Sequence, residues 1–184
     1  MPTFYEKLDD KLNGFIEEQN MFFVATTPRE GRINLSPKGL DSLRILSPTR
    51  VAYLNLTGSG NETSAHLLED NRMTMMFCSF TRTTNILRLY GRAHEINHEN
   101  AEFNDYYALF PNYAAPRQVY VLDIDSIQTS CGYGVPVMKL DHERETLDKY
   151  MENLGPDGVS EYKQKHNLKT IDGLRTRLPV DNLR

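Results

Sequence analysis

The residues with the greatest chemical potential lie in TGSGNETSAHL, from Thr57 to Leu67, directly after the apolar run VAYLNL. Two glycines, hydroxyls and amides stand there before a segment with helical character. The unpaired N–H groups at a helix N-terminus carry partial positive charge and bind phosphate readily. Asn61, Thr63 and Ser64 would add side-chain donors. The stretch therefore predicts an anion site.

The same stretch also fits an ordinary helix start. Ser59 and Glu62 have the spacing of a capping box, in which each side chain binds a backbone N–H group. The glycines beside them would then only let the chain turn. A carboxylate at Glu62 would also repel a dianion unless it turned away. Local sequence leaves both interpretations open.

A doubly charged anion also requires cationic partners. At about 4 Å and an effective dielectric constant of about 20, one cation contributes about 4 kcal/mol of attraction, and less where solvent screens it. Lys38 follows the strand stop Ser36-Pro37, while Arg88 and Arg92 share one face of a later strand. Each of these cations could equally be a solvated surface charge. Their position relative to the loop decides between the two roles.

A second candidate is SCGYGVP, which follows the last long strand. Its two glycines would permit close approach of a planar ligand, and Tyr133 could stack on it. A tight turn with a buried aromatic side chain is the alternative. Cys131 has no neighbouring base to activate its thiol. The five histidines lack the spacing of a zinc site, so no metal is predicted.

Composition limits the function classes. The 184 residues suffice for one domain with an appended tail, and the net charge of −4 disfavours nucleic-acid or anionic-membrane partners. No apolar run approaches the roughly 20 residues that span a bilayer. The N-terminus lacks the basic and apolar blocks of a signal peptide, and the two cysteines suggest reduced thiols. A cytoplasmic protein is expected.

The elements that must position these residues follow from periodicity. Residues 3–19 predict an amphipathic helix, and SAHLLEDN and ENAEFNDYYALF predict two more. Six or seven short strands succeed one another through turns: MFFVATT, RINLS, LRILS, RVAYLNL, RMTMMFCSF, ILRLYGRAHEI and RQVYVLDIDSI. Such succession favours an antiparallel barrel over a doubly wound sheet. The fold class is mainly β with flanking helices. The tail predicts two helices separated by a glycine break.

The ordered set RINLSPKG, VAYLNLTGSGNETSAHL, RMTMMFCSF and LRLYGRAHEI resembles the pyridoxamine 5'-phosphate oxidase-like superfamily of flavin-binding split barrels, over about residues 15–130. SCGYGVP and TIDGL resemble a branch other than the vitamin-forming oxidase. The resemblance implies a six-stranded antiparallel split β-barrel that forms a homodimer, with FMN between the subunits. We expect the barrel with its N-terminal helix over residues 1–135 and a helical extension packed on it over residues 136–184.

Carried over by position, the resemblance implies a set of cofactor-binding residues. Asn34, Leu35 and Ser36 would face the isoalloxazine edge, and Lys38 would lie near the phosphate or ribityl chain. The rest of the expected set is Asn55, Leu56 and Thr57 from the next strand, Ser59, Asn61, Thr63 and Ser64 on the phosphate, and also Arg88 and Tyr133. Ser36, Lys38 and the backbone near Thr57 would stabilise the reduced flavin.

The chain departs from the vitamin-forming oxidases in its cationic clamp. They carry a pattern close to RxxLLK followed by SRK, where this chain has NLSPKG and GSGNETS, and TIDGLRTRLPV lacks their substrate-binding arginine and histidine. We therefore predict an FMN-binding oxidoreductase that moves hydride or electrons between a reduced nicotinamide and a small acceptor, but not the vitamin oxidase. The alternatives are a non-catalytic flavin or haem binder, a deazaflavin protein, and a barrel without cofactor that acts as an interaction module.

Overall fold

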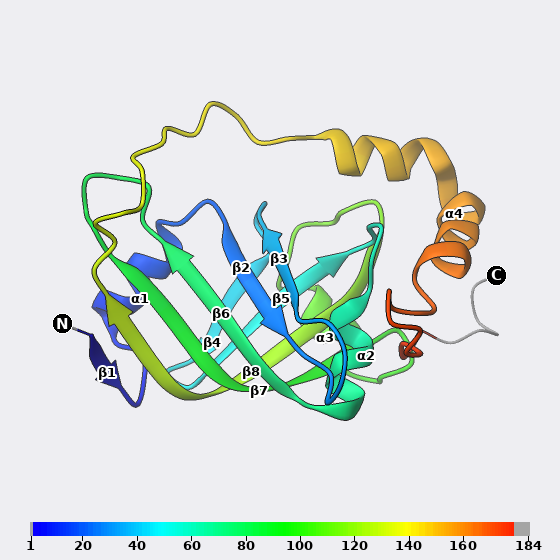
Figure 1. Ribbon diagram of the computed structural model, residues 1–184. Helices are drawn as coiled ribbons and strands as arrows, with labels where there is room; N and C mark the ends of the chain where they lie inside the picture. The colour runs from blue at the N-terminus through cyan, green and yellow to red at the C-terminus, as the bar shows by residue number, and fades with distance from the viewer. Residues whose placement is uncertain (1, 179–184) are drawn as a thin grey trace.

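Eight strands pair antiparallel into one curved sheet in the computed structural model, which describes residues 2–178 (Figure 1). The strands are β1 (Thr3–Tyr5), β2 (Phe22–Thr26), β3 (Asn34–Lys38), β4 (Leu43–Ser47), β5 (Arg50–Leu56), β6 (Arg72–Cys78), β7 (Ile86–Asn97) and β8 (Pro116–Ser130). Their order is β3-β2-β6-β7-β8-β5-β4, with β1 paired to β8. The helices are α1 (Asp10–Glu17), α2 (Glu62–Glu69), α3 (Phe103–Tyr107) and α4 (Thr146–His166). The predicted fold class is confirmed, with eight strands in place of six.

The N-terminal segment differs from the expected helix over residues 3–19. Thr3–Tyr5 form β1 against β8, and α1 begins only at Asp10. The Asp9 carboxylate accepts a hydrogen bond of 2.8 Å from the N–H of Leu12, which fixes the helix start there. Phe4 matches the helical spacing of the apolar residues that follow it, but its side chain is exposed on β1 and does not join the buried face of α1.

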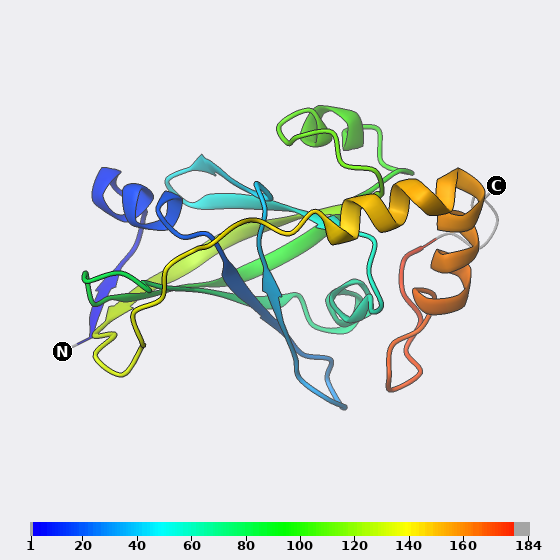
Figure 2. The ribbon, with the colours of Figure 1, turned by 90° about the horizontal axis from the view of Figure 1, so that it is seen from above.

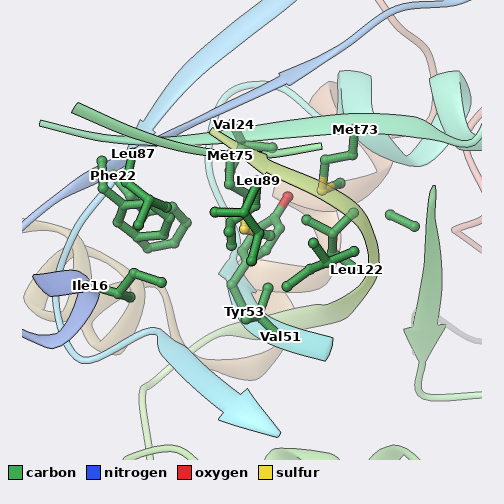
Figure 3. Close-up of a cluster of buried hydrophobic side chains, with 14 of the residues drawn as sticks. Ile16, Phe22, Val24, Val51, Tyr53, Met73, Met75, Leu87, Leu89 and Leu122 are labelled. Carbon is green, nitrogen blue, oxygen red and sulfur yellow. The ribbon is translucent and has the colours of Figure 1, made fainter. Parts of the chain in front are cut away.

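The core lies inside the curved sheet (Figure 3). Alternate residues of β6, namely Met73, Met75 and Phe77, are buried there, as the period-2 pattern requires. The rings of Phe22 and Phe77 stack with their centroids 5.5 Å apart. Met76 on the opposite face of β6 is only partly buried, so the strand is covered fully on one side. The core thus fixes the relative positions of the strands of the sheet.

One glycine permits the sheet to bend. The pairing of β7 with β8 shifts register between Tyr90 and Gly91. A Cβ atom placed on Gly91 would lie 1.9 Å from the carbonyl oxygen of Asp123. Only glycine tolerates this close backbone approach, which is typical of a bulge in a strongly curved strand.

The chain after β8 crosses one open end of the sheet before α4 (Figures 1 and 2). The expected glycine break lies within α4, where Gly155 has a φ of 66° and Pro156 starts the second segment. Met151 and Val159 of α4 pack against Ala115. The rest of the predicted extension, residues 179–184, lies outside the described residues. None of the helices in residues 2–178 has the length and apolar character to cross a membrane.

Candidate anion and cofactor site

A cavity of about 290 Å³ lies where the start of α2 meets β3, β5 and β8. It brings together predicted residues from all three predicted segments: Asn34, Ser36 and Lys38 of β3, Asn55 and Leu56 of β5, and Ser59, Asn61 and Thr63 around the start of α2. β3 and β4 are the two ends of the strand order, and β5 is next to β4. Because β3 and β5 both line the cavity, it lies where the barrel remains open.

Strand alternation explains why β3 contributes every second residue. Asn34, Ser36 and Lys38 are partly buried and line the cavity, while Leu35 and Pro37 between them are exposed. Leu35 is 63% exposed, on the face away from this cavity. Its predicted contact with the flavin therefore cannot come from this cavity wall.

Two cations line the cavity, the partly buried Lys38 and the buried Arg117. The Lys38 Nζ donates to the Oδ1 of Asn55 at 3.0 Å and lies 5.8 Å from the centre of the Tyr53 ring. Arg117 is only 3% exposed and also lines the cavity. Burial, and next the charge of Arg117, lower the pKa of Lys38 to about 8. Burial is also the main cause that lowers the pKa of Arg117.

The protein pairs neither cation directly with a carboxylate, although the charge of the buried Glu95 acts on Arg117 and raises its pKa against the larger effect of burial. Within residues 2–178, no Asp or Glu oxygen lies within salt-bridge distance of Lys38 or Arg117. Arg117 instead donates to backbone carbonyls, through Nη2 to Gly60 at 2.9 Å and through Nη1 to Gly58 at 3.5 Å. Buried charges are normally paired. An anion bound in the cavity would supply the missing partner.

A chain of amides fixes the walls of the cavity. The Nδ2 of Asn55 donates to the Oε1 of Gln118, and the Nε2 of Gln118 donates to the Oδ1 of Asn61, both at 3.1 Å. Gln118 is completely buried. Since Lys38 donates to Asn55, this network runs from β3 to the start of α2 and holds the polar groups in place before any ligand arrives.

The structure decides against the capping box. α2 begins at Glu62, so the N-cap position belongs to Asn61 and not to Ser59. The Asn61 side chain makes no bond to a helix N–H group, which leaves the first turn without a side-chain cap. The Glu62 carboxylate accepts from the N–H of Ile171, at 3.2 and 3.3 Å from its two oxygens. The acidic side chain at the cavity is therefore held by the C-terminal segment.

Two further predicted residues lie beside the cavity without lining it. Thr57 is completely buried and its N–H donates to the carbonyl of Ala115 at 3.0 Å. The Ser64 Oγ, also completely buried, accepts from the N–H of Arg177 at 3.0 Å. Both residues fix the position of the loop and of α2. Their direct contact with a ligand stays a prediction.

The remaining cationic and aromatic candidates lie elsewhere. Arg88 donates to the Oγ of Ser130 at 3.1 Å, and Arg92 donates to the Oδ1 of Asn71 at 2.8 Å. Tyr133 is 82% exposed in the segment after β8. None of the three lines the 290 Å³ cavity. Within one chain, the structure brings Lys38 to the predicted loop but not Arg88, Arg92 or Tyr133.

A larger cavity of about 800 Å³ offers less suitable chemistry. It lies between α1, β4 and the segment before α4, and its lining includes Ile16, Phe22 and Arg44. The Arg44 guanidinium is paired with the Asp41 carboxylate, with Nη2 and Oδ2 2.9 Å apart. In residues 2–178 no group of three or more His, Cys, Asp or Glu side chains could hold a metal ion. Unpaired buried charge thus distinguishes the smaller cavity.

Sequence comparison agrees with this architecture. Residues 8–131 match the family model described as pyridoxamine 5'-phosphate oxidase. The chain belongs to this family. It is also 39% identical over 192 residues to pyridoxamine 5'-phosphate oxidase family protein ustO of Aspergillus flavus, covering 95% of this chain and 77% of that protein.

Solved structures show the same fold at lower identity. HupZ from Group A Streptococcus is 18% identical with a TM-score of 0.51, over 65% of this chain and 91% of that one. A putative pyridoxamine 5'-phosphate oxidase from Lactobacillus delbrueckii is 21% identical with a TM-score of 0.53, over 67% and 94%. These similarities support the barrel and not a particular ligand.

Sequence reasoning missed several residues that build the site of this pyridoxamine 5'-phosphate oxidase family member. Arg117 and Gln118 open the strand RQVYVLDIDSI, and a charged residue at the start of a buried strand was an available signal. Asn167 and Lys163 come from the tail, where a helix rich in charge is usually a solvated surface. Burial lowers the pKa of Lys163 to about 8, with Arg117 as the second cause. No local pattern reveals that contact.

Proposed function

We propose that this pyridoxamine 5'-phosphate oxidase family member binds FMN, with the phosphate in the 290 Å³ cavity. The observation that carries this proposal is the pair of cations that line the cavity, the buried Arg117 and the partly buried Lys38, which form no salt bridge in residues 2–178. Hydrogen bonds to a charged group stabilise by about 1.5–3 kcal/mol each. The uncapped start of α2 adds backbone donors and a favourable dipole.

The donor set fits a phosphate with an attached polyol chain. Ser59, Asn61 and Thr63 supply hydroxyl and amide groups around the loop, and Asn34 and Ser36 continue this polar lining along β3. At about 290 Å³ the cavity lies at the lower end of the usual range for ligand sites, about 300–1,000 Å³. It has room for the headgroup and part of the chain. The ring system would extend beyond it.

We further propose a homodimer in which a second copy completes the site. Ile33 and Leu35 expose large apolar side chains on and beside the edge strand β3, at 75% and 63%. Contact with a second copy would cover them. Arg88 and Tyr133 lie outside the cavity of their own chain, and we propose that the partner copy supplies them to the flavin.

The proposed activity is hydride or electron transfer between a reduced nicotinamide and a small acceptor. Bound FMN supplies the redox chemistry, and the protein orients it and adjusts its electronics. Lys38 would donate to the anion from an Nζ atom that lies 5.8 Å from the centre of the Tyr53 ring. Ser36, two residues before it on the same face, would donate to the ring-proximal part of the ligand. The amide chain ending at Asn61 would keep these donors oriented.

A non-catalytic flavin binder on the same barrel is the second candidate. One observation favours it: the carboxylate in the cavity lining belongs to Glu62, which is bound by the Ile171 N–H. No histidine among residues 2–178 lines the cavity. Proton transfer would then depend on solvent, the substrate or the partner copy. Haem, bound where the barrel is open beside the 290 Å³ cavity, is an alternative cofactor for this binder.

The experiment is a binding titration of the purified chain with FMN and with riboflavin, followed by visible spectroscopy. Placement of the phosphate between these two cations predicts a preference for FMN of about 100-fold or more. Equal affinity for the two flavins would contradict the phosphate assignment, and a Soret band would replace FMN with haem. Bleaching of the flavin bands by reduced nicotinamide supports the oxidoreductase. A bound but inert flavin supports the non-catalytic binder.

A further inference from the structure

The C-terminal segment, residues 167–177, returns from α4 to the loop before α2 (Figures 1 and 2). Both views place it beside the loop that lines the proposed phosphate cavity. The contacts are specific and polar. They raise the question of what this segment contributes to the site.

Asn167 is the centre of these contacts. It is completely buried directly after α4. Its side-chain Nδ2 donates to the backbone carbonyl of Gly58 at 2.8 Å. Its backbone carbonyl accepts from the Nδ2 of Asn61 at 3.4 Å. The hydroxyl of Thr176 donates to the same carbonyl at 2.7 Å. Asn167 therefore binds the loop at two points and is itself held by the tail.

These bonds fix the direction of backbone donors in the loop. Arg117 holds the carbonyl of Gly60, as Asn167 holds that of Gly58. A peptide unit is planar and trans, so fixing its carbonyl also fixes the following N–H group. The N–H directions of Ser59 and Asn61 are thus set by Asn167 and Arg117. A loop containing two glycines would otherwise be free to rotate these peptide planes.

The same segment restrains the acidic side chain of the cavity. The N–H of Ile171 binds the Glu62 carboxylate. The next residue, Asp172, accepts from the N–H of Arg32 at 2.7 Å, which ties the segment to the hairpin between β2 and β3. Arg177 binds Ser64 of α2 through its N–H. The segment is therefore anchored on both sides of the loop.

We infer that Asn167 is a positioning residue for phosphate recognition, through which the C-terminal segment makes the site selective for a phosphorylated flavin. This inference rests on the proposed function. Asn167 does not contact the ligand in this scheme. It orients the loop donors, while Lys38 and Arg117 supply the charge.

The test compares FMN and riboflavin affinities of the full-length Asn167→Ala variant. Loss of the oriented donors should weaken FMN binding by about 10-fold and leave riboflavin binding within about 2-fold. Asn97→Ala is the matched control. Asn97 is a buried amide that donates to the Oε1 of Glu95 at 3.1 Å and lies outside the cavity lining. The Asn97→Ala variant should leave the ratio of FMN affinity to riboflavin affinity unchanged.

A milder variant keeps the inference testable if Asn167→Ala does not fold. Thr176→Val removes only the hydroxyl that holds the Asn167 carbonyl. It should lower the preference for FMN over riboflavin in the same direction, by about 3-fold. An equal loss for both flavins, or an unchanged ratio, would show that the segment is merely structural. If the wild-type chain binds neither flavin, the proposed function fails, and this inference with it.

Discussion

Replacing Lys38 by methionine should stabilise the ligand-free protein at neutral pH while weakening its affinity for FMN. In the folded chain the pKa of Lys38 falls from its ordinary value of 10.5 to about 8, mainly through burial and secondly through the charge of Arg117. The folded state therefore binds the Lys38 proton less tightly than the unfolded state. At pH 7 this difference costs about 3 kcal/mol of folding free energy.

The sign of the pH dependence follows from the lowered pKa. Between about pH 8 and pH 10.5 the unfolded chain carries more protons than the folded chain, so wild-type stability rises with pH there. At pH 10 the cost of the Lys38 charge falls to about 1 kcal/mol. Methionine lacks the charge but also leaves the Asn55 Oδ1 without its donor, which costs about 1–3 kcal/mol at either pH.

The difference between the two pH values isolates the charge. The free energy of unfolding of Lys38→Met minus that of wild type should fall by about 2.5 kcal/mol from pH 7 to pH 10. Urea denaturation of the ligand-free proteins measures it. Lys149→Met is the control, because Lys149 is an exposed lysine paired with Glu145 on α4. The partly buried Lys163, which also has a lowered pKa, is present in each protein, so its contribution cancels.

The same variant tests the site. FMN affinity should fall by about 10- to 100-fold, since one charge-assisted hydrogen bond to the phosphate is lost. Riboflavin affinity should change much less. An unfolding difference that does not vary with pH would show that the Lys38 charge is solvated. The argument for a partly buried cation without a salt bridge would then be wrong, and with it the case for an anion at this position.

Two further predictions concern the barrel itself. Gly91→Ala should destabilise the fold by about 3 kcal/mol or more in urea, because its Cβ would overlap the Asp123 carbonyl, whereas Gly134→Ala, with open space around it, should change stability by less than about 1 kcal/mol. A comparable loss in both variants would refute the close approach. Thiol labelling of the native chain should modify Cys131 quickly and Cys78 only after unfolding, because Cys78 is buried and burial raises its pKa. Rapid labelling of two thiols would contradict the described core.

Much of the fold could be predicted because strand signals are local. Alternation and turns found β2 to β8, but the predicted stop at Ser36-Pro37 was wrong, because β3 continues to Lys38 with Pro37 on its edge. The glycine break in α4 was visible as Gly155-Pro156. The first helix was predicted too long because Phe4 matches helical spacing. Phe4 instead lies in β1 and pairs with Gln128 of β8, which is far along the chain. Spacing alone does not report such pairing.

The site was predictable only in part, for the same reason. The loop residues and Lys38 were found because hydroxyls, glycines and a lysine near the end of a strand are visible in short stretches, although Lys38 lies in β3 and not after it. The capping box was wrong, since Glu62 bonds to Ile171, more than a hundred residues away. Arg117 and Asn167 reach the loop through tertiary contacts. Their role follows from the fold and not from their neighbours in sequence.

Pro37 has a consequence for how copies of this chain can associate. It is the fourth of the five residues of β3, which pairs only with β2 among the described strands and so forms an open edge of the sheet. A proline there has no N–H to offer an incoming strand. A second molecule therefore cannot extend the sheet smoothly along this edge, which protects the chain from open-ended, fibre-like stacking. The proposed homodimer would therefore form through side-chain surfaces and not by addition of a strand to β3.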